Sequence, residues 1–422
     1  MTEILSRRNF LAGAAAVAAA RPSLAANDVI NAGFIGTGSR GYYGLERLYQ
    51  GSKGLAVVTA VCDTYAGNLN RGKERVQKMG GNTPKTYVDY REMLADPSID
   101  AVFIMTPEHL HHPMAMAAIK AKKHIYLEKP IAHTVEEGAE IVKASEQSGK
   151  ILQVGTQNRS NPHYQKAKEM IEQGMIGEVH YVRAFWYRNF PSPTTPAPWR
   201  YVIPEDTNES NTNWDLFLGP ARKRPFNKQR YFQWRNYWDY SGGISTDLLV
   251  HQTDAANFVL NKTVPSSCMA SGGIYSWGPP NDDREAPDTL SAIYEYPDKF
   301  HLNYSCYFQN DHFGYGEQFM GHEGMIEVLN RSELHFYPQL SIAKAVPRVA
   351  TRKEVHAKQP MDNPSVESHI RNFLESVMGK AKPIAPASVG QLGAIPGHLA
   401  TQSYLKNKKV YWDARTAKLR FS

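Results

Sequence analysis

Short apolar runs alternate with amphipathic stretches along the first third of the chain. The runs occupy residues 29–35, 55–62, 99–105, 124–127 and 151–154. Stretches with helical periodicity separate them, and this alternation predicts successive strand–helix–strand units around one parallel sheet. We therefore expect an α/β domain with a doubly wound parallel sheet over residues 27–155.

The pattern changes after this domain. Pro162 opens a predicted helix, and residues 178–188 alternate as a strand. Further alternating segments follow at 289–296, 301–308 and 325–329. The segment 364–406 has the period of two helices. Residues 156–422 are therefore expected to form a C-terminal α/β domain with a large, mainly antiparallel sheet.

The first 26 residues differ from both predicted domains. Arg7 and Arg8 precede an alanine-rich run at 11–20 that has no polar face, and residues 23–25 supply the small side chains of a cleavage site. This arrangement resembles a twin-arginine signal peptide. We expect a periplasmic or secreted protein with no membrane anchor after cleavage. Because that route carries folded proteins, a cofactor can be loaded before export.

Composition is that of an ordinary globular protein and argues against several classes. Of the 422 residues, 42% are hydrophobic and 21% are charged, and the formal charge is +7. The basic residues are scattered, as on a solvated surface, so we expect no nucleic-acid partner. The three cysteines are far apart and form no CxxC pair, which argues against a disulfide framework or a zinc site.

A glycine-rich turn follows the first predicted strand. It comprises Gly36, Thr37, Gly38, Ser39, Arg40 and Gly41. A strand–turn–helix setting of this kind is typical of a dinucleotide fingerprint, in which glycines let backbone N–H groups approach a pyrophosphate. Asp63 ends the second predicted strand, where a carboxylate can accept hydrogen bonds from a ribose and repels a 2′-phosphate. We expect NAD as the cofactor, with NADP less favoured, since Arg40 could pair with a phosphate.

Three further motifs carry a resemblance to a known family. A TPxxxH segment begins at Thr106 and ends at His111, and an EKP triplet occupies residues 128–130. A glycine pair at 242–243 then precedes Asp247, His251 and Asp254, with Leu249 where glycine is usual. Together with the segments 153–160, 214–220 and 234–240, these motifs resemble the exported branch of the Gfo/Idh/MocA oxidoreductases.

The resemblance implies a Rossmann domain that holds the cofactor and a second domain that binds substrate. The residues that it places beside the cofactor are Thr106, Pro107, His109, His111, Glu128, Lys129 and Gln157. The histidines at 109, 111, 112 and 133 accompany no carboxylate or cysteine pattern that would complete a metal site. We therefore expect no metal.

Oxidation of a secondary alcohol needs a base for the hydroxyl proton and a group that stabilises the developing negative charge. Lys129 ends a predicted strand at the edge where open α/β sheets bind ligands. Asp247 and His251 lie four residues apart on a predicted helix and share one face. His251 titrates near neutrality and is the candidate base. These three residues are the candidate catalytic group, and each also contacts substrate in this interpretation.

Aromatic and arginine side chains complete the candidate substrate site. Trp234 can stack on a sugar ring, although many aromatic residues of this chain equally suit core packing. Arg159, Arg188 and Arg235 can bind hydroxyls or a carboxylate of a carbohydrate or polyol substrate.

Three functions of different classes follow from these residues. The first is an exported NAD-dependent oxidoreductase that transfers a hydride between a sugar or polyol hydroxyl and a tightly bound nicotinamide cofactor. The alternatives are a redox-neutral NAD-dependent glycoside hydrolase and a non-catalytic protein that binds sugar and NAD. A large sheet with too few helices to cover both faces further predicts a homodimer or homotetramer.

Overall fold

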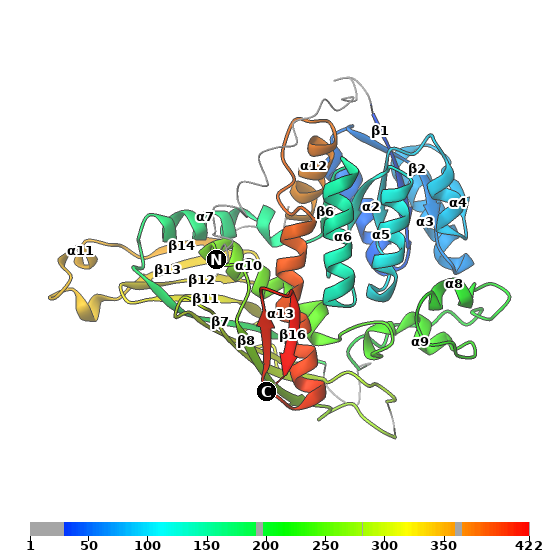
Figure 1. Cartoon of the computed structure of the whole chain (residues 1–422). Coiled ribbons are helices and arrows are strands. Elements are labelled where there is room, and N and C mark those ends of the chain that lie inside the picture. The colour runs from blue at the N-terminus through cyan, green and yellow to red at the C-terminus, as the bar shows by residue number, and fades with distance from the viewer. Residues whose placement is uncertain (1–28, 191–196, 281, 359–364, 422) are drawn as a thin grey trace, which may run out of the picture.

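The computed structural model describes residues 29–190, 197–280, 282–358 and 365–421, and Figure 1 shows its two sheets. The first sheet has six strands, all parallel, in the order β3-β2-β1-β4-β5-β6. The strands are β1 (Ile30–Ile35), β2 (Ala56–Cys62), β3 (Lys85–Tyr87), β4 (Ala101–Ile104), β5 (His124–Leu127) and β6 (Leu152–Val154). The predicted parallel sheet is confirmed. The edge strand β3 is largely exposed and has no apolar run, so the sequence pattern did not predict it.

Helices cover both faces of the parallel sheet. They are α2 (Ser39–Ser52), α3 (Ala66–Gly80), α4 (Tyr90–Ala95), α5 (His111–Lys120) and α6 (Val135–Ser148). Short 3-10 turns at Glu108–Leu110 and Gln157–Ser160 follow β4 and β6. Because both faces are covered, every residue of β4 is buried, and the strand has a continuous apolar run instead of an alternating one.

The second sheet has ten strands in the order β14-β13-β12-β11-β7-β10-β9-β8-β15-β16. They are β7 (Val179–Tyr187), β8 (Ser267–Gly273), β9 (Thr289–Glu295), β10 (His301–Tyr307), β11 (Tyr315–Gly321), β12 (Gly324–Leu329), β13 (Glu333–Pro338), β14 (Val355–Lys358), β15 (Val410–Asp413) and β16 (Lys418–Phe421). Its pairs are antiparallel except for β7 with β10. The expected mainly antiparallel sheet is confirmed.

One face of the second sheet is covered by α7 (Pro162–Glu172), α10 (Val250–Leu260) and α13 (Ala387–Lys406), as Figure 1 shows. The alternation along β9 explains the asymmetry, because Leu290, Ala292 and Tyr294 are buried whereas Ser291 and Glu295 are exposed. The sheet therefore buries one row of side chains under the helices and presents the other row on its opposite face.

The two C-terminal helices join the sheets. The helix α12 (Ser365–Val377) packs against α2 and adds Ile370, Phe373 and Leu374 to the core of the parallel sheet. The helix α13 contacts both α6 and β8, so it lies between the two sheets. The chain thus returns from the second sheet to the first, and α12 and α13 hold the two domains together.

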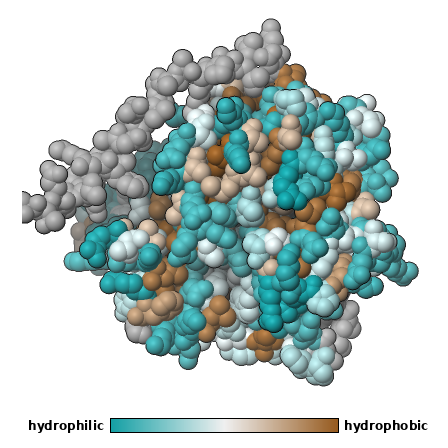
Figure 2. Space-filling view, turned by 45° about the vertical axis from the view of Figure 1, so that its right-hand side comes forward, coloured by the Kyte–Doolittle hydropathy of each residue, from teal (hydrophilic) through white to brown (hydrophobic). Residues whose placement is uncertain are grey.

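A segment between β7 and α10 extends under the parallel-sheet domain. It contains α8 (Trp214–Leu218) and α9 (Lys228–Phe232), drawn in green at the lower right of Figure 1. Phe217, Tyr231, Tyr237 and Tyr240 pack with Tyr65 of the first domain in one aromatic cluster. Figure 2 shows mainly hydrophilic residues on this side of the molecule, with hydrophobic ones in small groups. Within the described residues no helix is long and apolar enough to span a membrane.

Candidate active site

A cavity of about 410 Å³ opens between the two domains, and most of the predicted site residues line it. Those on its wall are Gly36, Gly38, Ser39, Arg40, Asp63, Thr106, Pro107, Glu128, Lys129, Gln157, Trp234, Arg235, Asp247 and His251. The first ten belong to the turns after β1, β2, β4, β5 and β6, where open α/β sheets bind their ligands. The last four come from the second domain.

The glycine turn forms a cradle that side chains would fill. A Cβ on Gly41 would lie 1.8 Å from the carbonyl oxygen of Gly36, and Gly36 itself has a φ of +88°. Gly38 caps α2 with no side-chain hydrogen bond, and a Cβ there would meet nothing closer than 3.6 Å. The free N–H groups at the start of α2 therefore remain available to an anion, and the residues present fit the pyrophosphate of a dinucleotide.

The Asp63 carboxylate is held by a dense set of donors. It accepts hydrogen bonds from the backbone N–H of Thr37 at 2.7 Å, that of Tyr65 at 3.0 Å and the hydroxyl of Tyr231 at 3.0 Å. Burial raises the pKa of Asp63, and these hydrogen bonds oppose the rise. Tyr231 comes from α9, so the second domain reaches over the position that a ribose would occupy.

Arg40 is already paired within the site. Its guanidinium donates to Glu128 Oε1 through Nε at 2.8 Å and through Nη2 at 2.6 Å. The Glu128 side chain also accepts from the backbone N–H of Lys129 at 3.2 Å. Arg40 therefore orients the turn that carries Lys129, and its charge is balanced before any phosphate arrives.

Lys129, Asp247 and Arg235 form a buried charge cluster across the domain interface. Lys129 Nζ lies 2.8 Å from Asp247 Oδ1 and also donates to the Asp247 carbonyl oxygen, while Arg235 Nε donates to Oδ1 at 3.1 Å. Burial alone would raise the pKa of Asp247, but the two cations hold it well below its usual range. Asp247 is therefore ionised at neutral pH, and it fixes the ammonium group at the cavity wall.

His251 lies beside this cluster on the first turn of α10. Its ring stacks on Trp186 with centroids 5.9 Å apart, and its Nδ1 is buried without a partner among the described residues. Burial lowers the pKa of His251 well below its usual value, and the charges of Lys129 and Arg331 add to that effect. The imidazole is therefore neutral at neutral pH and can accept a proton.

The backbone around Asp247 departs from the predicted regular helix. Asp247 lies in a π-helical turn, Ser245–Leu249, and the α-helix begins only at Val250. A turn of this type adds width to a helix and is frequent at functional sites. Asp247 and His251 both line the cavity, yet Asp247 bonds to Lys129 and Arg235 and not to the imidazole.

Four predicted residues are not among those that line the cavity. Gly41 ends the glycine turn and packs against the Gly36 carbonyl, and Arg159 forms three hydrogen bonds of 2.8–3.0 Å with Asp254. His109 contacts the carbonyl oxygen of Phe217 at 2.8 Å. His111 lies between the carbonyl oxygens of Thr106 and Pro130, at 2.9 and 2.6 Å. Arg159, His109 and His111 therefore bond to other parts of the protein and do not face the cavity.

The position between Pro107 and His109 carries a function that sequence reasoning missed. Glu108 is buried and accepts hydrogen bonds from Ser241 Oγ at 2.7 Å, Gly242 N at 3.1 Å and Thr246 Oγ1 at 2.8 Å. It therefore ties the turn after β4 to the glycine pair of the second domain. Glu108 lies at a variable position of the TPxxxH pattern, so the motif itself gave no signal for this role.

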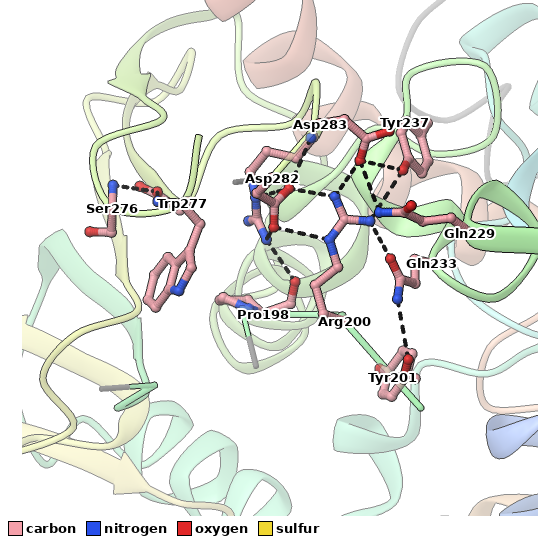
Figure 3. A network of polar contacts seen from close by, with 12 residues as sticks. Pro198, Arg200, Tyr201, Gln229, Gln233, Tyr237, Ser276, Trp277, Asp282 and Asp283 are labelled. Carbon is pink, nitrogen blue, oxygen red and sulfur yellow. Dashed lines mark hydrogen bonds and ion pairs between the residues drawn. The ribbon is translucent and has the colours of Figure 1, made fainter. Parts of the chain in front are cut away.

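A polar network fixes the loop that covers the cavity. Figure 3 shows Arg200 bound to Asp282 and Asp283 on one side and to Gln233 and Tyr237 on the other. Its neighbour Tyr201 lines the cavity, as does Trp234 after α9. Three separate segments of the second domain are thus held together over the site.

In the described ranges no group of three or more histidine, cysteine, aspartate or glutamate side chains is arranged to hold a metal ion. Cys62, Cys268 and Cys306 are all buried and free.

Fold and site together define a two-domain NAD-binding protein whose cofactor cradle opens on a buried Lys–Asp–His group. The family model described as "Oxidoreductase family, NAD-binding Rossmann fold" matches residues 30–156, and its companion, "Oxidoreductase family, C-terminal alpha/beta domain", matches residues 220–410. The chain belongs to this Gfo/Idh/MocA oxidoreductase family.

Curated relatives match parts of the chain. An uncharacterized oxidoreductase YrbE of Bacillus subtilis is 43% identical over 95 residues, which are 22% of this chain and 28% of the relative. A glycosyl hydrolase family 109 protein of Shewanella baltica is 32% identical over 160 residues, 36% of this chain and 34% of the relative. The levoglucosan dehydrogenase of Pseudarthrobacter phenanthrenivorans is 27% identical over 256 residues, which are 59% of this chain and 58% of the relative. The matched stretches thus span less than two thirds of these relatives.

A solved structure shares the whole fold. The levoglucosan dehydrogenase in complex with NADH superposes with a TM-score of 0.69 at 20% identity, covering 91% of this chain and 99% of that one. This likeness extends over both sheets and supports the architecture described above.

The two glycines that differ in local space allow a direct test of the cradle. We expect Gly41→Ala to lower the free energy of unfolding by about 1–3 kcal/mol, because its Cβ collides with backbone. The Cβ of Gly38→Ala would meet no protein atom closer than 3.6 Å, so this variant should unfold like the wild type. The same Cβ would occupy space that the pyrophosphate needs, so NADH should bind at least about tenfold more weakly. Urea unfolding and NADH fluorescence titration measure the two effects. Unchanged NADH affinity in Gly38→Ala would contradict the cradle.

Proposed function

We propose that the protein is an exported NAD-dependent oxidoreductase that acts on a hydroxyl group of a sugar or polyol. One observation carries the proposal, namely that Lys129, Asp247 and His251 meet on the wall of the same cavity that contains the glycine cradle. The match to a levoglucosan dehydrogenase over 59% of the chain, and to a myo-inositol 2-dehydrogenase over 52%, supports the substrate class.

The side chains divide the chemistry between them. A bound nicotinamide supplies the hydride acceptor or donor. Lys129 donates a hydrogen bond to the substrate oxygen and stabilises negative charge there, because Asp247 already holds its ammonium at the cavity wall. His251 is neutral and takes the hydroxyl proton. Asp247 stays ionised and orients Lys129, and its second oxygen is available to a neighbouring hydroxyl.

The cover over Asp63 supports tight retention of the cofactor. Tyr231 donates to Asp63 and also lies 2.9 Å from Thr64 Oγ1, while the backbone of residues 211–213 bonds to Thr64 and Ala66. Release of a dinucleotide from under this segment requires these contacts to open. A retained cofactor suits a protein that works outside the cytoplasm, where free NAD is scarce.

A glycoside hydrolase that uses NAD without net oxidation is the second candidate. The similarity to a glycosyl hydrolase family 109 protein over 36% of the chain favours it. The non-catalytic alternative is disfavoured because Lys129, Asp247 and His251 all line the cavity that contains the glycine cradle, an arrangement that binding alone does not require.

Substrate turnover separates these functions. The purified protein is mixed with a panel of nitrophenyl glycosides and free polyols while cofactor absorbance and released nitrophenol are followed together. We expect reduction of the bound cofactor with no nitrophenol. Steady release of nitrophenol without net reduction would establish the hydrolase, and silence in both channels across the panel would favour the binding protein.

Single-turnover hydride transfer tests the catalytic assignment. We expect Lys129→Ala and His251→Ala each to slow transfer by roughly 10²–10⁴-fold while the cofactor stays bound. Because both act on one proton transfer, the double variant should be little slower than the slower single variant. His180→Ala, on β7 outside the cavity, is the matched control. Wild-type transfer in His251→Ala would show that the assignment is wrong.

We also propose that the open face of the large sheet pairs with a second copy. Met269 and Ile293 are neighbours across β8 and β9 and remain 40% and 46% exposed on the face that the helices leave open. We expect light scattering to give a dimer or tetramer, and Ile293→Lys to shift it toward the monomer. Leu340→Lys, at an exposed site in the 3-10 turn that follows β13 and not on a strand, should leave the mass unchanged. A monomeric wild type would end the proposal.

Export rests on residues 1–26, which lie outside the described part of the chain. Arg7 and Arg8 with the alanine-rich run that follows support a twin-arginine route to the periplasm or beyond. Replacing both arginines by lysine should leave a folded reporter fusion inside the cell, whereas Arg21→Lys should not. Unchanged export of the double variant would contradict the proposal.

A further inference from the structure

Two arginines of the second domain reach the cavity beside His251. Arg188 follows β7, and Arg331 lies in the hairpin turn between β12 and β13. Their guanidinium carbons lie 5.1 and 5.3 Å from the centre of the Trp186 ring, on which His251 also stacks. Both cations therefore gather around one aromatic side chain at the substrate end of the cavity.

Arg331 is one of the two central residues of a tight hairpin turn. Its φ is +59° and that of Asn330 is +50°, so both central residues of this hairpin turn lie in the left-handed region. The turn is held in place from both sides, because Asn161 Nδ2 donates to the Arg331 carbonyl and the Tyr315 hydroxyl donates to that of Asn330. The turn and these hydrogen bonds therefore hold the Arg331 backbone in place at the cavity.

Several buried donors at this end have no acceptor. Within the part of the chain that the structure describes, Arg331 Nε, Arg331 Nη2 and Trp186 Nε1 are buried without a hydrogen-bond partner. Buried donors are normally satisfied, and each one left unpaired is unfavourable. Their common need is an acceptor, and a charged acceptor meets it best.

Three other cations of the cavity have carboxylate partners, whereas Arg188, Arg331 and Arg71, which lies on α3 of the first domain, have none among the described residues. Lys129 and Arg235 share Asp247, and Arg40 binds Glu128. Over the described ranges, neither Arg188 nor Arg331 forms an ion pair.

Glu317 is a buried carboxyl group that interacts electrostatically with Arg331, but it does not neutralise the positive charge of Arg331. Glu317 on β11 is fully buried and accepts a hydrogen bond from the Tyr164 hydroxyl at 2.7 Å. Burial raises the pKa of Glu317 to about 8, against the opposing effects of Tyr164 and Arg331. At neutral pH this carboxyl group is largely protonated, so the positive charge of Arg331 remains at the cavity.

We propose that Arg188 and Arg331 bind an anionic group of the substrate, so that the sugar or polyol carries a carboxylate or a phosphate. This inference rests on the proposed function, since it names the substrate class of the same site. A carboxylate between the two guanidinium groups can accept from both, and Trp186 and His251 line the same cavity as the two arginines. The acid group thus sets which hydroxyl reaches His251.

Matched pairs of neutral and anionic sugars test this recognition. The probes are the methyl glycosides of glucose, galactose and mannose, the corresponding uronates, and the corresponding 6-phosphates. Each is titrated by calorimetry into the NADH-loaded full chain. We expect at least one anionic probe to bind about tenfold or more tightly than its neutral partner, as charge-assisted hydrogen bonds predict. The tighter of the uronate and phosphate series identifies the anion.

Arginine variants assign the preference to its source. Arg331→Met and Arg188→Met should each bring the anionic probe to within about threefold of the neutral one. Arg183→Met is the control, because Arg183 lies on the same strand as Trp186 but is not among the cavity-lining residues. A full preference for the anion in both Arg188 and Arg331 variants would overturn the proposal. Equal or tighter binding of every neutral probe to the wild type would also overturn it.

Binding and turnover can fail separately. If a neutral sugar is oxidised as efficiently as its uronate and phosphate, the oxidoreductase assignment stands and the anion site is refuted. If the anionic probe binds tightly through Arg331 but no probe reduces the cofactor, the anion site stands and the oxidoreductase assignment is refuted.

Discussion

The ion pair between Lys129 and Asp247 joins the two domains where the chemistry is expected. The ammonium nitrogen lies 2.8 Å from the carboxylate oxygen, and both side chains are nearly removed from water. Charges in such a setting are stable only when each is paired and hydrogen-bonded, and Arg235 supplies the remaining partner. Separation of the domains would leave both groups unpaired. The docked arrangement that satisfies them is the same one that places His251 at the cavity.

Polar contacts of the same kind hold the rest of the interface. Glu108 receives three hydrogen bonds from the second domain, and Tyr231 of that domain donates to Asp63. Apolar surface alone would allow the domains to slide, since it has no directional preference. Each buried carboxylate instead favours one relative orientation of the two domains, because its hydrogen-bond donors on the other domain must lie within about 3 Å of it. The cavity therefore has a defined width before any ligand enters.

Local pattern predicted the elements, and motifs predicted most of the cavity wall. The parallel strands could be predicted because both of their faces are buried. The edge strands β3 and β16 are short and largely exposed, and β15 has only four residues, so none of the three gives such a signal. Contacts between side chains far apart in the sequence could not be predicted from local pattern. Arg159 looked free for substrate, yet Asp254, 95 residues later, binds it. Arg331 reaches the site only because a hairpin turn projects it there, and no local pattern marks that turn as part of a site.

The charges around His251 link proton transfer to what the cavity holds. Accepting a proton would add a cation beside Lys129 and Arg331, and this repulsion, after burial itself, keeps the imidazole neutral. Asp247 offsets part of it, but that carboxylate is already shared by two cations. Negative charge brought in by a ligand, or developing on its hydroxyl oxygen, reduces the repulsion and strengthens His251 as a base. The cations beside His251 therefore make it a weak base, and a correctly placed substrate supplies the electrostatic change that proton transfer requires.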